Sequence, residues 1–414
     1  MPEQAGVDFY QYWGVAKCQR ATNFILGSPY RNGAGYGAQL RQLAAASGDA
    51  TLQRAVASRD APDLTGTPFV YYLMGSLPGP YSRTLLLYRA ALFAAFALAV
   101  FLLARPLASP AMAGALAAST AVASDALLLD LAVGNLSSLQ LLGLVGAAVV
   151  ARRDPRLRTA LWLPPLLVLL TLVKPVVGLA AGLLGLSLLL RQVSWQARAV
   201  VVGSAAAAGL FAALPALLFG SVTVWPDWWS ATFSSGERLA YEVVQGNYSG
   251  VALLARLGGH STGWGLAWVA ASLGGSVLAL AALVRWRHGA GSGFGAATLE
   301  FLRDPLAAAS LGIVALLALS PLVWSHYGVL AVAPALWLCG PGGGPWPRAL
   351  GWLSLLLVVD LPRRLYLLLP DLPWMVLDLN HAFAWIPLWI GMLGVLAAKL
   401  PAPPLNPPLP PRPS

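Results

Sequence analysis

The sequence has little charge and almost no cysteine. Only 10% of its 414 residues are Asp, Glu, Lys or Arg, whereas a soluble domain carries about 25%. Together with 58% hydrophobic residues, this excludes a cytosolic enzyme and a disordered chain, because too few polar side chains remain to cover a water-soluble globule. The two cysteines, Cys18 and Cys339, exclude a disulfide scaffold. The remaining class is an all-α polytopic membrane protein, consistent with a mean hydropathy of +0.69.

Lysine is also scarce, since the basic residues comprise 3 Lys and 23 Arg and the net charge is +10. A basic chain can bind nucleic acid, but that needs a basic face on a soluble module. Here the arginines lie between apolar runs, which is the positive-inside pattern of membrane proteins. We therefore expect no nucleic-acid partner, and we place the short basic connections in the cytoplasm, at 152–158, 191–198 and 285–288.

Long apolar runs predict about eleven transmembrane helices. They lie at 85–104, 107–124, 131–150, 159–173, 175–190, 199–219, 265–284, 306–321, 328–340, 349–361 and 383–399. Several are so short that a helix at 1.5 Å per residue spans only about 20–24 Å, less than a hydrocarbon core of about 30 Å. Short and broken helices are tolerated where they line a polar cavity, so the pattern favours a site at membrane depth.

The order of spans and basic connections divides the chain into three parts. Residues 1–84 form an outer-face loop with interfacial helices, residues 85–400 form the transmembrane bundle, and residues 401–414 form a proline-rich disordered cytoplasmic tail. Within the first part, residues 37–57 suit one helix lying along the outer leaflet and residues 67–73 a second short piece. Function is therefore expected on the outer face.

Lys174 is the most informative ionisable residue. It interrupts the apolar run 166–190 and directly precedes Pro175, which breaks a helix. A charge within a membrane helix costs about 2.5–3.5 kcal/mol on insertion scales and is a functional hypothesis by default. A lone cation at an outer helix break suits an anionic group such as phosphate, and the alternative is a lysine whose ammonium reaches out to the membrane interface.

Asp8 and His326 are the other ionisable candidates. Asp8 precedes Phe9 and Tyr10, and partial desolvation among aromatic residues suits a carboxylate to act as a general base. Its alternative is a solvated loop acid. His326 lies between two short spans and can donate to a phosphate oxygen or titrate near neutrality. Its alternative is an interfacial histidine beside an aromatic belt.

An outer segment supplies further polar and aromatic residues. Asn247 and Ser249 precede Arg256, and the tryptophans of 225–229 either stack on a sugar or anchor the chain in the headgroup region. The four histidines show no metal-ligand spacing, and no Walker loop, CxxC, HExxH or GxSxG motif is present. We therefore predict no metal and no cofactor.

In this order, the motifs resemble the polyprenol-phosphate-dependent glycosyltransferases of the GT-C superfamily, and among them glycosyltransferase family 87. The similar segments are an Asp before aromatics at 8–10, Gly-x-Pro-Tyr at 27–30, a Pro-aromatic run at 67–72, Gly-Asn at 134–135, Lys-Pro at 174–175, Asn-x-Ser and a following Arg at 247–256, and Ser-Pro-x-x-Trp-x-His at 320–326. The resemblance covers about 6–340. Two features depart from it. Family members begin with a transmembrane helix before the aspartate, and one such helix added to the eleven predicted here would give about twelve. The acid that precedes the last histidine of the family motif is replaced by Ser325.

The resemblance implies a GT-C type helical bundle in a bacterial plasma membrane, with its active site facing the periplasm or the cell exterior. It implies inverting, metal-independent transfer of mannose or arabinofuranose from a polyprenyl-phosphate donor to a glycolipid or polysaccharide acceptor, with membrane lipid as a further partner. Asp8 is then the catalytic base, and the donor phosphate contacts Lys174, His326 and Arg256. The residues expected to bind substrate are Asn247, Tyr12, Tyr30 and Trp324.

A secondary transporter of an anionic solute is the leading alternative. It also explains Lys174, the short helices and a cavity at membrane depth. Transporters usually carry repeats with broken helices in corresponding positions. The single Lys-Pro break and the long outer segments favour the enzyme. A non-catalytic assembly partner or a flippase also stays open.

Overall fold

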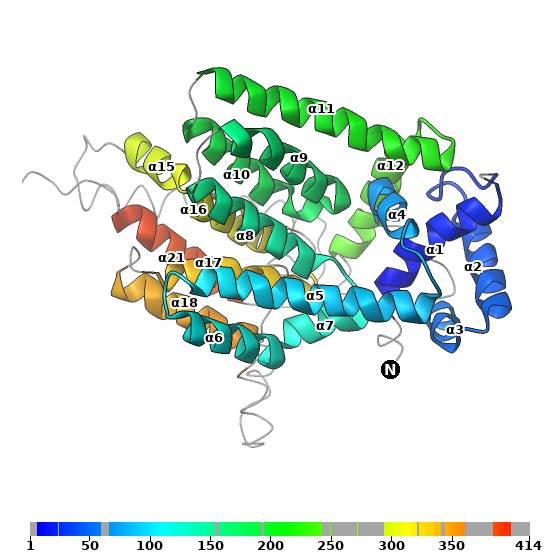
Figure 1. Cartoon of the computed structure of the whole chain (residues 1–414), viewed down its shortest axis with the longest axis horizontal. Helices are drawn as coiled ribbons and strands as arrows, with labels where there is room; N and C mark the ends of the chain where they lie inside the picture. Colours follow the sequence, from blue (N-terminus) through cyan, green and yellow to red (C-terminus); the bar gives the residue numbers. More distant parts are fainter. Residues whose placement is uncertain are drawn as a thin grey trace, which may run out of the picture.

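The computed structural model describes residues 6–23, 25–58, 66–153, 157–191, 194–241, 249, 271, 294–320, 323–340, 344–359, 361 and 384–398. Across these residues the chain forms helices and no β-strand, in agreement with the all-α prediction. Figure 1 shows a bundle of long helices with a group of shorter helices at one end.

The amino-terminal cap is the group of short helices at that end of the molecule. It consists of α1 (Val7–Ala21), α2 (Gly33–Ser47), α3 (Ala50–Ala57) and α4 (Pro68–Gly75). The predicted piece at 67–73 is confirmed as α4, which Thr67 caps by accepting from the Val70 amide. The single helix predicted at 37–57 is wrong, because Gly48 adopts a left-handed φ of 66° and ends α2.

The helical bundle follows the cap. Its first half contains α5 (Tyr81–Ala104), α6 (Pro110–Ala123), α7 (Asp125–Val133), α8 (Ser137–Arg153), α9 (Leu157–Val173), the 3-10 turn η2 (Pro175–Val177), α10 (Gly178–Arg191) and α11 (Ser194–Phe219). Its second half contains α12 (Val224–Tyr241), α15 (Phe294–Arg303), α16 (Pro305–Leu319), η4 (Ser325–Ala331), α17 (Val332–Leu338), α18 (Pro345–Val358) and α21 (Trp385–Ala398).

Two of the described helices, α5 and α11, are long and apolar enough to cross a membrane. The pair α6 and α7 adds a third crossing if it is counted as one span bent by 62°, and several shorter apolar helices accompany them. The chain is thus a helical membrane protein, but the expected eleven crossings are not confirmed. The expected span at 265–284 lies outside the described residues, apart from residue 271.

The predicted span at 131–150 is wrong because the helix breaks within it. Ser124 starts α7 by accepting from the Leu127 amide, and Gly134 ends α7 with a left-handed φ of 71°. Residues 134–136 then connect to α8. Hydropathy alone predicts one continuous helix here, because it takes no account of the helix-ending role of glycine.

The predicted break at Pro175 is confirmed. The helix α9 ends at Val173, Lys174 is extended with φ −153° and ψ 104°, and Pro175 opens η2. The carbonyl groups freed by this break find partners in other elements. The Thr67 hydroxyl donates to the Leu172 and Val173 oxygens at 2.6 and 3.0 Å, and the Gln140 amide donates to the Lys174 oxygen at 3.2 Å. A broken backbone at membrane depth needs such partners.

Two hydrophobic cores meet at these two breaks. The cap core is rich in aromatic side chains such as Phe9 and Tyr71, and it also includes Leu136 and Val173. The bundle core has residues on both sides of each break, such as Leu127 and Leu141 around the first and Leu170 and Val177 around the second. The non-helical backbone at 134–136 and at 174 therefore lies on the boundary between cap and bundle.

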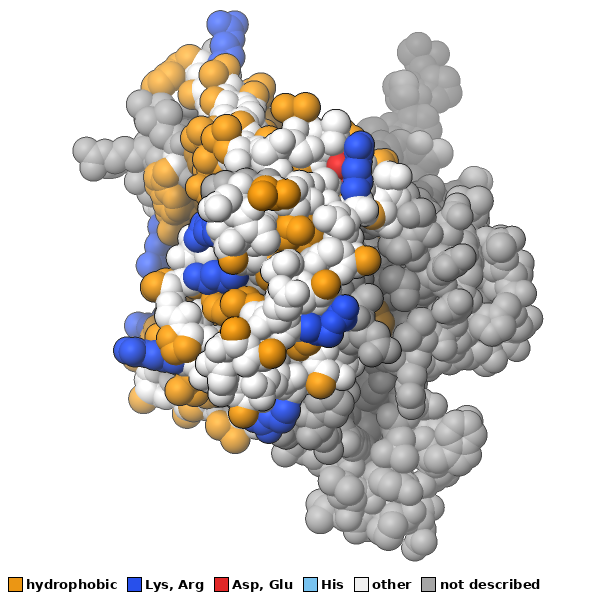
Figure 2. Space-filling model, turned by 90° about the vertical axis from the view of Figure 1, so that its right-hand side faces the viewer, with side chains coloured by type: hydrophobic (Ala, Val, Ile, Leu, Met, Phe, Trp, Pro, Cys, Tyr) orange, Lys and Arg blue, Asp and Glu red, His pale blue; other side chains and the backbone are white. Residues whose placement is uncertain are grey.

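The outer surface of the cap carries basic side chains among hydrophobic ones (Figure 2). Figure 2 views this end of the molecule, and lysine and arginine side chains are spread over it between apolar ones. Exposed arginines of the cap include Arg20, Arg41 and Arg54. A surface of this kind suits the headgroup region of a membrane better than its hydrocarbon core.

One carboxylate of the cap starts two helices. The Oδ1 atom of Asp49 accepts from the Thr51 and Leu52 amides of α3 at 3.0 and 3.1 Å, and its Oδ2 atom accepts from the Ser82 amide of α5 at 2.8 Å. Burial alone would raise the pKa of Asp49, but these hydrogen bonds outweigh it and lower the pKa.

We expect Asp49→Ala to destabilise the protein, with the loss of the α3 cap alone worth about 0.5–2 kcal/mol. Because the folded-state pKa is lowered, this stabilisation is present above the ordinary aspartate pKa and is lost as the pH falls through the folded value. Thermal unfolding in detergent should thus separate wild type from variant at pH 7 and less so near pH 3. An equal difference at both pH values would contradict the assignment.

Candidate active site

Asp8 lies in the first turn of α1, so the alternative of a solvated loop acid does not hold. The neighbouring Phe9 ring is fully buried and lies 4.8 Å from the Tyr88 ring and 5.7 Å from the Tyr81 ring, both on α5. This aromatic packing fixes the start of α1 against the bundle and so fixes the position of the carboxylate.

Asn135 connects Asp8 to the bundle. Its amide nitrogen donates to Oδ2 of Asp8 at 2.7 Å, and its amide oxygen accepts from Nζ of Lys174 at 2.6 Å. The Asp8 carboxylate and the Lys174 ammonium thus bind the nitrogen and the oxygen of the same Asn135 side chain. The two residues are 166 positions apart in the sequence, and only the fold brings them together.

Lys174 points into the protein. Besides its bond to Asn135, its ammonium group lies 4.4 Å from the centre of the Tyr327 ring, a cation–π distance. The alternative of a lysine that reaches out to the membrane interface therefore does not describe this side chain. The extended conformation at the helix break directs it toward α7 and η4.

His326 belongs to the same cluster. It is 7% exposed, and its ring lies 4.7 Å from the Tyr327 ring in an edge-on arrangement. The Tyr327 ring thus contacts both the imidazole of His326 and the ammonium of Lys174. Trp324, which directly precedes η4, is partly buried against the bundle core.

Tyr12, Tyr71 and Tyr30 form a row of aromatic rings beside this cluster. The Tyr71 ring lies 6.2 Å from the Tyr12 ring and 6.1 Å from the Tyr30 ring. Tyr12 lies one helical turn after Asp8 in α1. Burial, and then the charge of Asp8, raise the pKa of the Tyr12 phenol well above its ordinary value, so the phenol keeps its proton.

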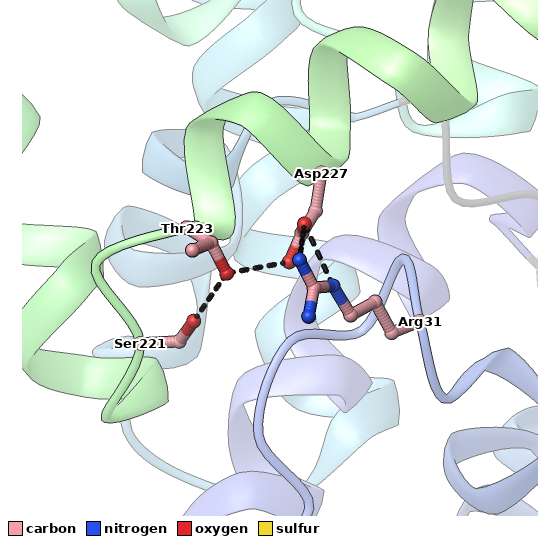
Figure 3. A network of polar contacts seen from close by, with 4 residues as sticks. All are labelled: Arg31, Ser221, Thr223 and Asp227. Atoms are coloured by element: carbon pink, nitrogen blue, oxygen red, sulfur yellow. Dashed lines mark hydrogen bonds and ion pairs between the residues drawn. The ribbon is translucent and has the colours of Figure 1, made fainter.

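A separate polar network fixes the segment that carries Tyr30. The guanidinium of Arg31 binds Oδ1 of Asp227 at 2.7 and 2.8 Å, and the Thr223 hydroxyl donates to Oδ2 at 3.1 Å (Figure 3). The Asp227 side chain is only 6% exposed, whereas that of Arg31 is 67% exposed. The network ties the loop before α2 to the start of α12.

Two predicted site residues, Asn247 and Arg256, lie outside the described residues. The nearby tryptophans of 225–229 begin α12 rather than a loop. The Trp225 indole donates to the Ala212 oxygen of α11 at 2.8 Å, and Trp229 is exposed.

Several residues that shape the cluster are not among the predicted site residues. The sequence marks Asn135 only as part of a Gly-Asn motif, and no motif singles out Tyr327. Asp130 is fully buried and starts α8, since its Oδ2 atom accepts from the Ser138 amide and hydroxyl at 3.1 and 2.6 Å. A carboxylate inside the apolar run 126–133 was the signal that would have singled it out.

Within the part of the chain that the structure describes, no group of three or more His, Cys, Asp or Glu side chains is placed to hold a metal ion. The side chains that converge are a carboxylate, an amide, an ammonium, a phenol and an imidazole. Such a set can bind an anionic group and move a proton.

Comparison with known families decides the class of protein. The model of glycosyltransferase family 87 matches residues 65–303, more than half of the chain. The chain belongs to glycosyltransferase family 87. This family 87 protein is thus a glycosyltransferase with apolar membrane helices, and the resemblance noted in its sequence is confirmed. The match includes Asn135 and Lys174 and excludes Asp8 and His326. Comparisons with curated proteins and with solved structures give no match.

Gly134 controls how closely α1 approaches the cluster. A Cβ atom at this position would lie 2.6 Å from Cβ of Phe9, and the left-handed φ also disfavours any side chain. We expect Gly134→Ala to push α1 away, lowering both thermal stability and glycosyl transfer. Gly146 in α8 is the matched control, because a Cβ there meets nothing within 4 Å.

Gly146→Ala should leave transfer unchanged and raise helix stability by up to about 1 kcal/mol. Unfolding temperature and transfer rate of both variants in detergent check the pair. Gly134→Ala with wild-type stability and turnover would show that this close approach is unimportant.

Proposed function

We propose that this family 87 glycosyltransferase moves mannose or arabinofuranose from a polyprenyl-phosphate donor to a glycolipid or polysaccharide acceptor. One observation carries the proposal. The carboxylate of Asp8 and the ammonium of Lys174 bind the two ends of the Asn135 amide, where cap and bundle meet. A base and a cation at this spacing match the two charge changes of the reaction, at the acceptor hydroxyl and at the leaving phosphate.

In the proposed reaction, Asp8 takes the proton from an acceptor hydroxyl while that oxygen attacks the anomeric carbon of the donor sugar. The bond between this carbon and the phosphate oxygen breaks, the configuration inverts, and polyprenyl phosphate leaves with one more negative charge. Lys174 stabilises that charge, and His326 donates to the phosphate. A well-placed donor of this kind is worth about 3–4 kcal/mol in the transition state.

Tyr12 and Tyr30 are the proposed contacts for the sugar, and the fully buried Tyr71 ring packs against both of them. The protonated Tyr12 phenol would donate to a sugar hydroxyl. Trp324, before η4, is a further substrate contact in this proposal. Arg256 and Asn247 are assigned to phosphate and sugar by the family resemblance alone.

The distribution of arginines supports an outer-face site in a bacterial plasma membrane. The helix α8 starts beside Asn135 at the cap and ends at Arg152 and Arg153. At this far end Arg191 donates to the Ala151 oxygen at 2.6 Å, and Arg152 pairs with Asp304 at 3.4 Å. The positive-inside rule applies to short connections, so in this proposal the arginines of the short connections at this end are cytoplasmic, and the long cap, although it is also basic, faces the exterior.

A lipid-linked donor suits the surroundings of the cluster. Both helix breaks adjoin apolar helices, and in this proposal a polyprenyl chain in the bilayer brings its headgroup to them. A transporter of an anionic solute would use the same cation, and family membership favours transfer over transport.

We predict that Asp8→Asn lowers glycosyl transfer by at least about 100-fold, because general-base catalysis typically contributes 10²–10⁴-fold. Purified protein is incubated with a panel of polyprenyl-phosphate sugars, and release of polyprenyl phosphate is measured. Glu300→Gln, on the exposed surface of α15, is the matched control and should keep wild-type turnover. Near wild-type turnover by Asp8→Asn would refute the base assignment.

We predict that Lys174→Ala mainly impairs use of the donor. The KM for the donor lipid should rise and kcat should fall, because the leaving phosphate loses a cation, whereas the KM for the acceptor should change little. Lys17→Ala, which removes a lysine that donates to the Leu77 oxygen in the cap, is the comparison. A donor titration curve of Lys174→Ala that overlays that of wild type would contradict the role.

A further inference from the structure

We infer that Asn135 is a positioning residue whose amide keeps Asp8 and Lys174 one amide group apart. The effect on catalysis rests on the proposed function, whereas the separation of the Asp8 and Lys174 charges is a property of the fold. The Nδ2 atom donates to Asp8 at 2.7 Å, and the Oδ1 atom accepts from Lys174 at 2.6 Å. Removing the amide would let the flexible lysine side chain close onto the carboxylate.

Chemistry fixes the orientation of this amide. An ammonium group only donates hydrogen bonds, and a carboxylate only accepts them, so the oxygen must face Lys174 and the nitrogen must face Asp8. The Leu136 backbone amide also donates to Oδ1, at 2.7 Å. In a flipped side chain, the amide nitrogen would face the Lys174 ammonium, which also only donates. The amide oxygen would face the Asp8 carboxylate, which also only accepts.

The backbone of Asn135 is held as firmly as its side chain. The residue is 3% exposed, its carbonyl oxygen accepts from the Tyr88 hydroxyl at 2.7 Å, and its amide donates to the Asp130 oxygen at 3.0 Å. Arg89 donates to the Leu131 and Ala132 oxygens at 2.7 and 2.8 Å, which holds the end of α7 just before the break. These contacts fix the backbone from which the Asn135 side chain reaches both charges.

The spacing matters because a direct ion pair would weaken both groups. A cation in contact with a carboxylate stabilises its ionised form and lowers its pKa, which makes it a poorer base. The ammonium would also be occupied by Asp8 rather than by the leaving phosphate. A neutral amide between them satisfies one hydrogen bond of each group and leaves their charges in place.

Other ionisable groups surround this pair and enter the interpretation of any pH dependence. Those that feel the charge of Asp8 come from α1, α5, the break at 174 and η4, and they are Tyr12, Tyr88, Lys174 and Tyr327. Asp130 on α7 acts on the last three of these. The tyrosines remain protonated in the range where a carboxylate titrates, so Asp8 and Asp130 are the acids to separate.

The test compares wild type, Asn135→Ala, Asp8→Asn and the double variant that combines Asn135→Ala with Asp8→Asn, by thermal unfolding in detergent between pH 3 and pH 8. If the lysine closes onto Asp8, then Asp8→Asn costs more stability in the Asn135→Ala background than in wild type. Because only an ionised carboxylate pairs with the ammonium, this excess is present at pH 7 and shrinks toward pH 3, where carboxylates become protonated. Asp130 is present in all four proteins and cancels.

An excess that is absent, or equal at every pH, overturns the inference. Asn135→Ser repeats the cycle in case Asn135→Ala does not fold, since a serine is also too short to span the two charges. This arm needs no enzyme activity. If the double-mutant cycle shows no coupling between positions 135 and 8 but Asp8→Asn is inactive, the role of Asn135 as a spacer is rejected. The proposed function is then unaffected.

The second measurement is the pH profile of kcat/KM for Asn135→Ala and Asn135→Ser. We expect the acidic limb to move down by about 1 pH unit, because the carboxylate gains a cation as its neighbour. A lowered plateau with an unmoved limb would mean that the amide only supports the fold, and the spacer role would fail.

Discussion

The rest of the site depends on two hydrogen bonds made by one buried amide. Asn135 binds a carboxylate from the cap and an ammonium from the bundle, and both partners are costly at membrane depth unless they are satisfied. The same residue is anchored by Tyr88 and by the backbone of Asp130. Without this amide, no neutral group separates the carboxylate of Asp8 in the cap from the ammonium of Lys174 in the bundle.

Two helix breaks make this arrangement possible. Gly134 ends α7 where a side chain would strike Phe9, and Pro175 ends α9 next to Lys174. Each break frees backbone groups, and the fold supplies partners for them from distant segments, such as Thr67 for the carbonyl groups at the end of α9. Breaks with satisfied backbone at the boundary of two cores are what a polar site inside a membrane bundle requires.

Membership of glycosyltransferase family 87 establishes glycosyl transfer as the class of reaction. The proposed donor, acceptor and roles come from the chemistry of the cluster and from the resemblance in motifs. Asp8 and Lys174 are 2.7 and 2.6 Å from the nitrogen and the oxygen of the Asn135 amide. The proposed base and the proposed phosphate ligand therefore lie close together. Tyr327 contacts the ammonium of Lys174, and its ring also lies against that of its neighbour His326.

The sequence alone determined the membrane class, the all-α fold and the break at Lys174-Pro175, because hydropathy and proline act locally. It also determined which ionisable residues were out of place, since charge is rare in this chain. It did not find the break at Gly134, the two helices in place of one at 37–57, or the role of Asn135. Those depend on Phe9 packing against Gly134 and on side chains 127 and 39 positions apart meeting at one amide, and only tertiary contacts decide such pairings.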